Sequence, residues 1–220
     1  MNPFIRVQRV EKDYGPTKVL RGVDLEIQAG ERVAIRGASG SGKSTLLYLL
    51  GGLERPGKGS VEVGGKNLSQ LNDEGLAAFR NSAVGFVFQF HFLLPSLSAI
   101  GNILLPARIG GHDAKTIEAR ARNLAQRLGV ASCLDKWPHQ LSGGEQQRIN
   151  IVRALSLKPP LLLCDEPTGN LDSMNSGKVT ELLSELALEN KTTLIVVTHD
   201  DKVASAFERK IVIEDGHILR

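Results

Sequence analysis

Residues 37–44 form the run Gly37-Ala38-Ser39-Gly40-Ser41-Gly42-Lys43-Ser44, and the fold class follows from this run and its neighbours. The run matches the pattern G-x-x-x-x-G-K-[ST] of phosphate-binding loops. The apolar segment before it, 32–36, is a predicted strand, and the apolar segment after it, 44–50, is a predicted helix. Because this pattern binds phosphate between a strand and a helix, we predict a nucleotide site here. A glycine-rich turn that binds nothing would explain neither the full pattern nor its position.

The residue types of this loop suit a bound nucleotide. Glycines let backbone N–H groups turn towards phosphate oxygens, and the helix that starts near Gly42 adds unpaired N–H groups and a positive dipole end. We expect Lys43 to reach the β- and γ-phosphates and Ser44 to ligate Mg²⁺. The predicted ATP-binding loop comprises Gly37, Ala38, Ser39, Gly40, Ser41, Gly42, Lys43, Ser44 and Thr45.

An apolar run over 161–164 is followed by two acidic residues, Asp165 and Glu166. The run predicts a buried strand that places Asp165 beside the Mg²⁺ site and Glu166 next to the γ-phosphate. Glu166 would then polarise the attacking water. The alternative is a surface glutamate that only caps the end of the strand. The phosphate-binding loop in the same chain favours the catalytic interpretation.

A third run, Leu-Ser-Gly-Gly-Glu-Gln at 141–146, opens a predicted helix. Ser142 is a good N-cap, which leaves N–H groups of the first turn unpaired. Gly143 and Gly144 allow a phosphate to approach closely, and Glu145 begins the predicted helix over 145–157. A capped helix start that binds nothing is the alternative.

Strands alternate with helices along the rest of the chain. Alternating or apolar runs predict strands over 23–27, 61–63, 84–88 and 193–197, and a hairpin around Asp215-Gly216. Between about 91 and 158 the pattern is helical, as in the stretch 115–128. We predict one α/β domain over 1–220. Its core has a mainly parallel sheet built from 1–90 and 159–220, and the helical subdomain is inserted over about 91–158.

The composition excludes several classes of protein. The net charge of +3 at pH 7 is too small to indicate a nucleic-acid partner. Two cysteines, Cys133 and Cys164, cannot form a disulfide framework, which favours a reduced, intracellular protein. No signal peptide is evident, and the apolar runs are far shorter than the ~20 residues needed to cross a bilayer. If the protein acts at a membrane, we expect another chain to span it.

The three motifs together resemble those of the ATP-binding cassette (ABC) ATPases, and the resemblance covers essentially the whole chain. In that family, segments of the LSGGQ type are diagnostic. The resemblance implies a P-loop NTPase (RecA-like) core with a mainly parallel sheet, an N-terminal antiparallel β part and an inserted helical subdomain. It also implies a homodimer that binds ATP between its two chains and closes when ATP binds.

Four further residues match the family pattern in their order along the chain. Tyr14 resembles the aromatic residue that stacks on adenine. Gln89 resembles the glutamine that senses Mg²⁺ and the membrane partner. Asp172 ends a run that resembles the D-loop, and His199 resembles the switch histidine that contacts the γ-phosphate. Taken alone, Tyr14 is more often a packing residue, Gln89 a solvated residue and His199 a structural histidine. Their order along the chain supports the functional interpretation.

The resemblance assigns three sets of site residues. The catalytic residues are Lys43, Glu166 and His199. The Mg²⁺ ligands and sensor are Ser44, Gln89 and Asp165. Besides the loop 37–45, the ATP-binding residues are Tyr14, Gln89, Ser142, Gly143, Gly144, Glu145 and Asp172.

Within the family, the run Phe-Gln-Phe-His-Phe-Leu-Leu-Pro at 88–95 resembles the Q-F-H-x-L-L-P run of ATPases from bacterial lipoprotein-releasing (Lol) systems. That resemblance implies LolC/LolE or MacB-like permease partners and a peripheral location on the cytoplasmic face of the inner membrane. The apolar residues of this run are expected to dock the permease or to pack in the helical subdomain. Asn150 departs from the family, whose members usually carry alanine there.

The sequence is also compatible with other functions. The run 165–172 is shared with MacB-type exporters and with FtsE-type ATPases, which signal through a permease-like partner without moving cargo. A P-loop kinase acting on a small molecule is a third class, although it has no use for the segment 141–146. The leading prediction is an ATP-hydrolysing subunit that energises export or lipoprotein release through a separate permease.

Overall fold

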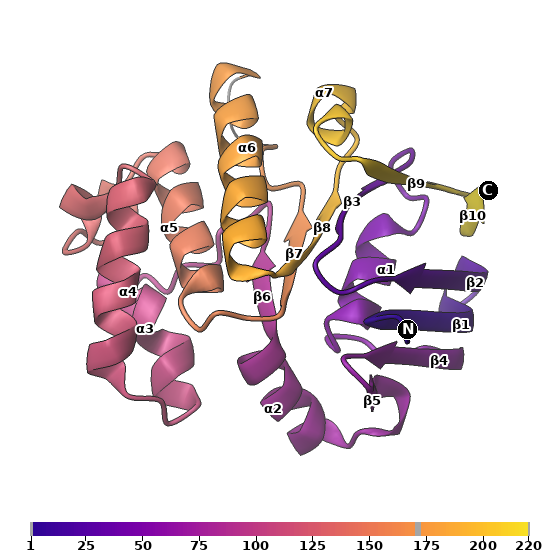
Figure 1. Ribbon diagram of the computed structural model, residues 1–220. Coiled ribbons are helices and arrows are strands. Elements are labelled where there is room, and N and C mark those ends of the chain that lie inside the picture. Colours follow the sequence, from indigo (N-terminus) through magenta and orange to yellow (C-terminus); the bar gives the residue numbers. More distant parts are fainter. Residues whose placement is uncertain (1, 170–172, 220) are drawn as a thin grey trace.

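Two β-sheets and a group of helices lie in a row across the computed structural model, which describes residues 2–169 and 173–219 (Figure 1). The first sheet is antiparallel, with strand order β2-β1-β4-β5. Its strands are β1 (Ile5–Tyr14), β2 (Thr17–Ile27), β4 (Lys58–Val63) and β5 (Lys66–Asn67). The second sheet has the order β10-β9-β3-β8-β7-β6. Its strands are β3 (Arg32–Arg36), β6 (Val84–Val87), β7 (Leu161–Asp165), β8 (Thr193–Val197), β9 (Arg209–Glu214) and β10 (His217–Leu219).

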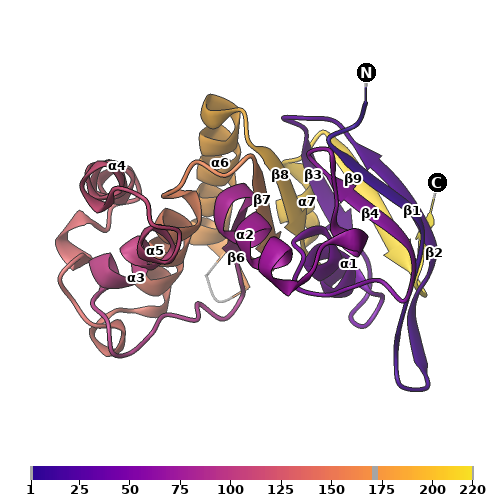
Figure 2. The ribbon, with the colours of Figure 1, turned by 90° about the horizontal axis from the view of Figure 1, so that it is seen from below.

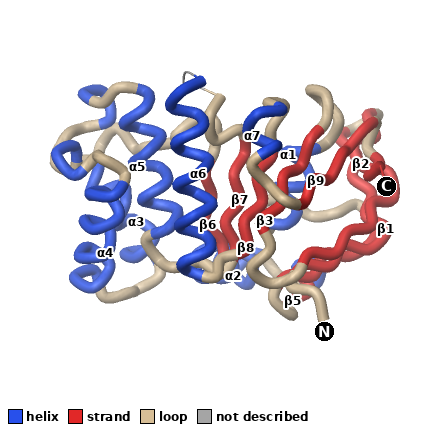
Figure 3. Tube along the Cα trace, turned by 45° about the horizontal axis from the view of Figure 1, so that its top comes forward, coloured by secondary structure: helices blue, strands red, loops and turns tan. Residues whose placement is uncertain are grey.

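The helices connect and cover these sheets. They are α1 (Lys43–Leu50), α2 (Asp73–Ala83), α3 (Ala99–Ile109), α4 (Ala114–Arg127), α5 (Gly143–Leu155), α6 (Ser173–Asn190) and α7 (Asp201–Ser205). Helices α3, α4 and α5 pack against one another at the end of the molecule opposite the antiparallel sheet (Figures 2 and 3). None of the helices within residues 2–169 and 173–219 is both long and apolar enough to cross a membrane.

In the second sheet, the loops that follow four of the strands all begin at the same edge. Strands β9, β3, β8, β7 and β6 are parallel neighbours, and only β10 is antiparallel to its partner. The carboxyl ends of β3, β6, β7 and β8 therefore meet at the same edge, which is where ligands bind in parallel sheets. The predicted α/β class with a mainly parallel sheet is confirmed, as is the antiparallel N-terminal part.

Strand β7 is buried on both faces. Leu161 and Leu163 pack with α1 and the antiparallel sheet, whereas Leu162 and Cys164 pack on the other face with α5 and α6. This alternation follows from the two-residue period of a strand, and it explains the unbroken apolar run in the sequence. The strand ends at Asp165, which thus emerges from the core at the edge described above.

Some elements differ from the sequence prediction. The strand expected over 23–27 is the end of a longer strand, β2, and the helix expected from 145 begins at Gly143. No helix was predicted from the sequence for the residues of α2. In α2 the buried residues are Leu76 and Phe79 alone, so the helix has too few apolar positions to show a clear period.

Candidate functional site

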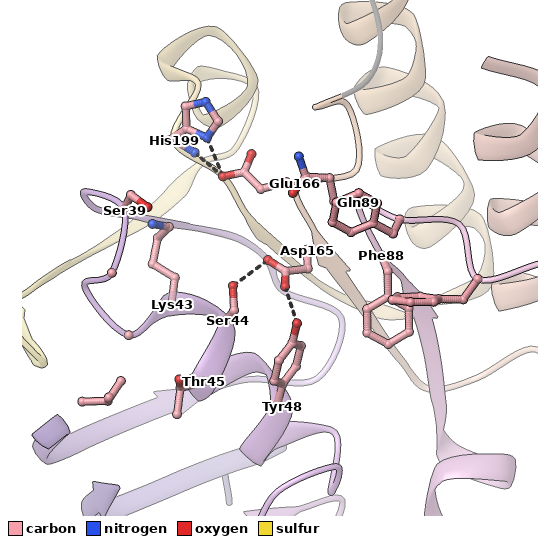
Figure 4. A pocket seen from close by; sticks show the side chains of 15 residues that line it. Ser39, Lys43, Ser44, Thr45, Tyr48, Phe88, Gln89, Asp165, Glu166 and His199 are labelled. Atoms are coloured by element: carbon pink, nitrogen blue, oxygen red, sulfur yellow. Dashed lines mark hydrogen bonds and ion pairs between the residues drawn. The ribbon is translucent and has the colours of Figure 1, made fainter. Parts of the chain in front are cut away.

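A cleft of about 730 Å³ opens where the loops after β3, β6, β7 and β8 converge (Figure 4). Its walls combine the phosphate-loop pattern, the two acidic residues after β7 and aromatic residues after β6. The lining residues are Val19, Ser39, Gly40, Gly42, Lys43, Ser44, Thr45, Tyr48, Phe88, Gln89, Phe90, Phe92, Asp165, Glu166 and His199. Motifs separated by more than 100 residues in the sequence therefore share one cavity.

The loop between β3 and α1 depends on glycine at two positions. An ideal Cβ at Gly37 would lie 2.1 Å from the backbone oxygen of Ile213, so no side chain fits there. Gly42, the residue before α1, has φ 104°, and a Cβ there would lie 2.9 Å from the backbone oxygen of Val19. Only glycine tolerates both the close approach and the left-handed backbone. These two close approaches place the loop directly against β2 and β9.

Lys43 points into this loop. Its Nζ donates to the backbone oxygens of Gly37 at 2.9 Å and Ala38 at 2.8 Å, and the side chain is buried. These oxygens are neutral, so they do not compensate the ammonium charge. Within the described part of the chain, the buried Ser41 hydroxyl oxygen has no hydrogen-bond partner. A buried cation and an unpaired hydroxyl in a glycine loop fit a bound phosphate.

Asp165 is held from two sides by hydroxyl groups. Ser44 Oγ donates to Oδ1 and Tyr48 Oη donates to Oδ2, each at 3.0 Å. Burial raises the pKa of Asp165 above that of an ordinary aspartate, and the two hydrogen bonds oppose this rise. A carboxylate beside a serine hydroxyl is a suitable pair of oxygen ligands for Mg²⁺. The donor set therefore fits the cation that the sequence predicts.

Glu166 is fixed by the end of β8. Its carboxylate accepts from the hydroxyl of Thr198 at 3.2 Å and from the backbone N–H of His199 at 2.9 Å, and the His199 ring lies 2.7 Å away through Nδ1. The backbone of Glu166 has φ 47°, a conformation that non-glycine residues rarely adopt. Such strain is typical of functional positions. Two of the three residues predicted as catalytic, Glu166 and His199, thus form a direct contact in the cleft.

Gln89 and Tyr14 differ in how closely they approach this centre. Gln89 follows β6 and lines the cleft, and its side chain lies beside Gly169, where an added Cβ would be 3.1 Å from Nε2. Tyr14 ends β1 and is outside the residues that line the cleft, but its hydroxyl interacts with Thr45, which does line it. Asp172 lies outside the described residues.

The segment 142–145 is placed away from the cleft of its own chain. Strands β6 and β7 lie between α5 and α1 (Figure 1). Ser142 caps α5 through a bond from the Glu145 N–H, and the Glu145 carboxylate accepts from the backbone N–H of Ser142 at 2.7 Å. Gly143 and Ser142 are exposed, and a Cβ on Gly143 would meet nothing within 4 Å. This helix start therefore faces outwards. The N–H groups of its first turn lack partners within the helix, and only that of Glu145 is satisfied by the cap.

Tyr48 belongs to the site as well, although no motif in the sequence pointed to it. It lies one helical turn after Ser44 on α1, so both side chains reach Asp165. The spacing of four residues was the available signal. The raised pKa of Tyr48, about 12, comes first from burial and then from the negative charge of Asp165. Tyr48 therefore stays protonated and acts as a donor to that carboxylate.

The apolar run after Gln89 divides between surface and core. Phe90 and Phe92 are 68% and 63% exposed, and Leu94 is also exposed. Leu93 instead packs against the core of the helical region. Phe92 contacts Phe88 edge-on at 5.3 Å between ring centroids, and Phe88 stacks on Phe86 at 5.1 Å. Leu93 therefore packs in the helical region, as expected for part of this run, and the permease contact expected for the exposed residues stays a prediction.

Comparison with known protein families matches residues 20–169 to a family described as ABC transporter. Two curated relatives are both named lipoprotein-releasing system ATP-binding protein LolD. The one from Cytophaga hutchinsonii is 44% identical over 219 residues and covers 100% of both chains. The one from Bdellovibrio bacteriovorus is 46% identical over 216 residues and covers 96% of this chain and 98% of the relative.

Solved structures show the same similarity. The dimeric structure of a bacterial ABC transporter cassette superimposes with a TM-score of 0.91 at 39% identity, over 98% of this chain and 97% of that one. A second structure is a dimeric cassette in a post-hydrolysis state bound to ADP and Pi, with a TM-score of 0.87 at 37% identity over the same shares of the two chains.

Proposed function

Because the chain belongs to the ABC transporter family and is an ABC ATPase, we propose that it is the ATP-hydrolysing subunit of a lipoprotein-releasing transporter. The observation that carries this proposal is the identity of 44–46% to LolD proteins along the whole chain. The cargo would be bound by a separate permease of LolC/LolE type. This chain would then act from the cytoplasmic face of the inner membrane as a peripheral subunit.

ATP binding is assigned to the loop 37–45 and the cleft beside it. Lys43, now bonded to two loop oxygens, would turn its ammonium to the β- and γ-phosphates. Ser44 and Asp165 would hold Mg²⁺, with Gln89 next to it. The cation would neutralise charge on the phosphates. Tyr14 would contact the base from the edge of the cleft.

Glu166 and His199 are assigned to hydrolysis. Glu166 would orient or deprotonate the attacking water, since its carboxylate is already fixed by Thr198 and by the His199 N–H. The His199 ring, 70% exposed at its side chain, can leave the carboxylate and face the γ-phosphate. Catalysis by these groups consists of positioning and charge stabilisation, as is general for phosphoryl transfer.

The complete site would require two chains. The outward-facing start of α5, with Ser142, Gly143 and Gly144, would bind the γ-phosphate of the ATP held by the loop of a second chain. The dimeric cassette at 39% identity supports this arrangement. ATP then acts as a bridge that closes the dimer, and hydrolysis removes the bridge.

The permease contact is assigned to the exposed part of the run after Gln89. Phe90, Phe92 and Leu94 present apolar side chains beside the cleft. Exposed aromatic clusters of this kind are typical of interaction sites. Because Gln89 and these residues belong to one short segment, nucleotide binding and permease contact would affect each other.

A capture experiment tests the assignment. Glu166→Gln protein with ATP and Mg²⁺ is used as bait in detergent-solubilised membranes. Glu166→Gln/Lys43→Ala protein serves as the control with weakened nucleotide binding, at an ATP concentration that saturates the first bait only. We expect a permease pair with large extracytoplasmic domains, together with lipoprotein, on the first bait alone. A bait that dimerises with ATP yet captures no membrane protein contradicts the transporter assignment.

An FtsE-like signalling role was the alternative predicted from the sequence. The names of the full-length relatives favour lipoprotein release instead. Reconstitution with the captured permease in vesicles separates the two functions. ATP-dependent release of lipoprotein supports the proposal, and stimulated ATPase activity with no released cargo supports signalling.

A further inference from the structure

Helix α5 carries a polar stripe, defined here as Gln147, Asn150 and Arg153. The spacing of three residues puts these side chains on one face of the helix. That face is turned towards the interior, since Gln147 is 2% exposed and Asn150 is 0% exposed. Buried polar groups are costly unless they are hydrogen-bonded. The partners of the stripe therefore indicate what it does.

Asn150 and Arg153 bind the segment that contains Gln89. Asn150 Nδ2 donates to the backbone oxygen of Phe88 at 3.3 Å, and its Oδ1 accepts from Arg153 at 2.8 Å. Arg153 also donates to the backbone oxygens of His91 at 2.8 Å and Phe92 at 2.9 Å. Two neighbouring side chains thus hold three backbone oxygens on both sides of Gln89.

The oxygens that Arg153 binds are all neutral. Burial lowers the pKa of Arg153 to about 10, which leaves it charged at neutral pH. A charged donor binds carbonyl oxygens more strongly than a neutral one. Phe92 has φ 47°, a conformation that non-glycine residues avoid. The arginine therefore fixes a segment whose backbone does not favour this shape by itself.

Gln147 makes the corresponding contact to the loop after β7. Its Nε2 donates to the backbone oxygen of Pro167 at 2.6 Å. Pro167 directly follows Glu166, so the stripe contacts two of the loops that carry polar residues into the cleft, those after β6 and β7. One face of α5 thus contacts both the segment 88–92 and the residue after Glu166. Ser142 is the N-cap of this same helix.

We propose that Asn150 is a positioning residue for ATP hydrolysis. With Arg153 and Gln147 it holds Gln89 and Glu166 in fixed register with α5. A shift of the segment 88–92 in one nucleotide site would then move Ser142, Gly143 and Gly144, which serve the other site. This inference rests on the roles proposed above for Gln89, Glu166 and the α5 start.

The test compares Asn150→Ala with Ile149→Val, a matched control that removes one buried methyl group from the same helix. Hydrogen exchange is first measured without nucleotide. We expect faster exchange of the amides of 89–92 in Asn150→Ala and wild-type exchange there in the control. This readout does not depend on any catalytic role, so it separates a failure of this inference from a failure of the proposed function.

Steady-state ATPase kinetics form the second readout. For Asn150→Ala we expect kcat to fall about tenfold, with KM for ATP within about twofold of wild type, because the loss affects positioning rather than binding. If Asn150→Ala does not fold, Asn150→Asp takes its place, since it keeps the size and the acceptor for Arg153 but loses the donor to Phe88. Unchanged exchange at 89–92, or a kcat equal to that of Ile149→Val, overturns the inference.

Discussion

The phosphate loop and the polar stripe of α5 hold their neighbours in two different ways. The loop is shaped by its own backbone, and its decisive contacts join Lys43 to residues five and six positions away. The stripe holds a loop that is 61 or 62 residues away in the chain through side-chain donors. A local pattern thus creates the first region, and tertiary packing creates the second. Substitutions in the first should therefore have larger effects on chemistry than those in the second.

The largest effect is expected at Glu166, which directly follows the last residue of β7 and lines the cleft. Glu166→Gln removes the group assigned to the water, so we expect kcat to fall about 100-fold or more while ATP binding stays intact. ADP release and the binding of a fluorescent ATP analogue are the two measurements. Hydrolysis at the wild-type rate would show that another residue activates the water.

Lys43→Ala tests the phosphate loop itself. The loss of a buried charged donor should weaken ATP binding roughly 10- to 100-fold. ATP binding is measured by titration calorimetry in the Glu166→Gln background, because that substitution prevents turnover during the measurement. Lys58→Ala is the control, because Lys58 forms an exposed ion pair with Glu11, and neither residue is among those that line the cleft. It should leave binding unchanged.

The effect of Tyr48→Phe on nucleotide binding is expected to be smaller than that of Lys43→Ala. The variant keeps the ring but removes the bond to Asp165, so we expect the Mg²⁺ concentration for half-maximal nucleotide binding to rise about threefold. Equal Mg²⁺ dependence in wild type and Tyr48→Phe would mean that Ser44 alone orients the carboxylate.

The smallest effect concerns the start of α5 and depends on pH. Hydrogen bonds from Cys133 and from the backbone and hydroxyl of Ser142 lower the pKa of Glu145 to about 2, from an ordinary value of 4.5. The ionised carboxylate therefore stabilises the fold fully above pH 4.5, and this contribution is lost as pH falls towards 2. The Tm difference between wild type and Glu145→Gln should be largest near neutral pH and shrink below pH 4.5. A constant difference across that range would contradict this assignment.

The same contrast explains what could be predicted from the sequence. Lys43, Ser44, Asp165 and Glu166 lie in two short motifs that each follow a predicted strand. The carboxyl ends of parallel strands share one sheet edge, and the cleft there contains all four residues. Tyr48 was missed although its spacing from Ser44 was informative. The function of Asn150 could not be predicted, because its partner Phe88 is 62 residues away and no local pattern encodes that contact.

The central claim is that each ATP site is built from two chains. Gly143 is suited to test it, because an added Cβ there has no neighbouring atom within 4 Å. We therefore expect an aspartate at this position to act mainly on a partner's nucleotide. Lys43→Ala and Gly143→Asp proteins are each expected to hydrolyse ATP poorly. When they are mixed, a heterodimer places both defects in one site and leaves the other intact. We predict that the mixture regains ATPase activity several-fold above the sum of the two separate proteins. Activity that stays at that sum would contradict a shared site.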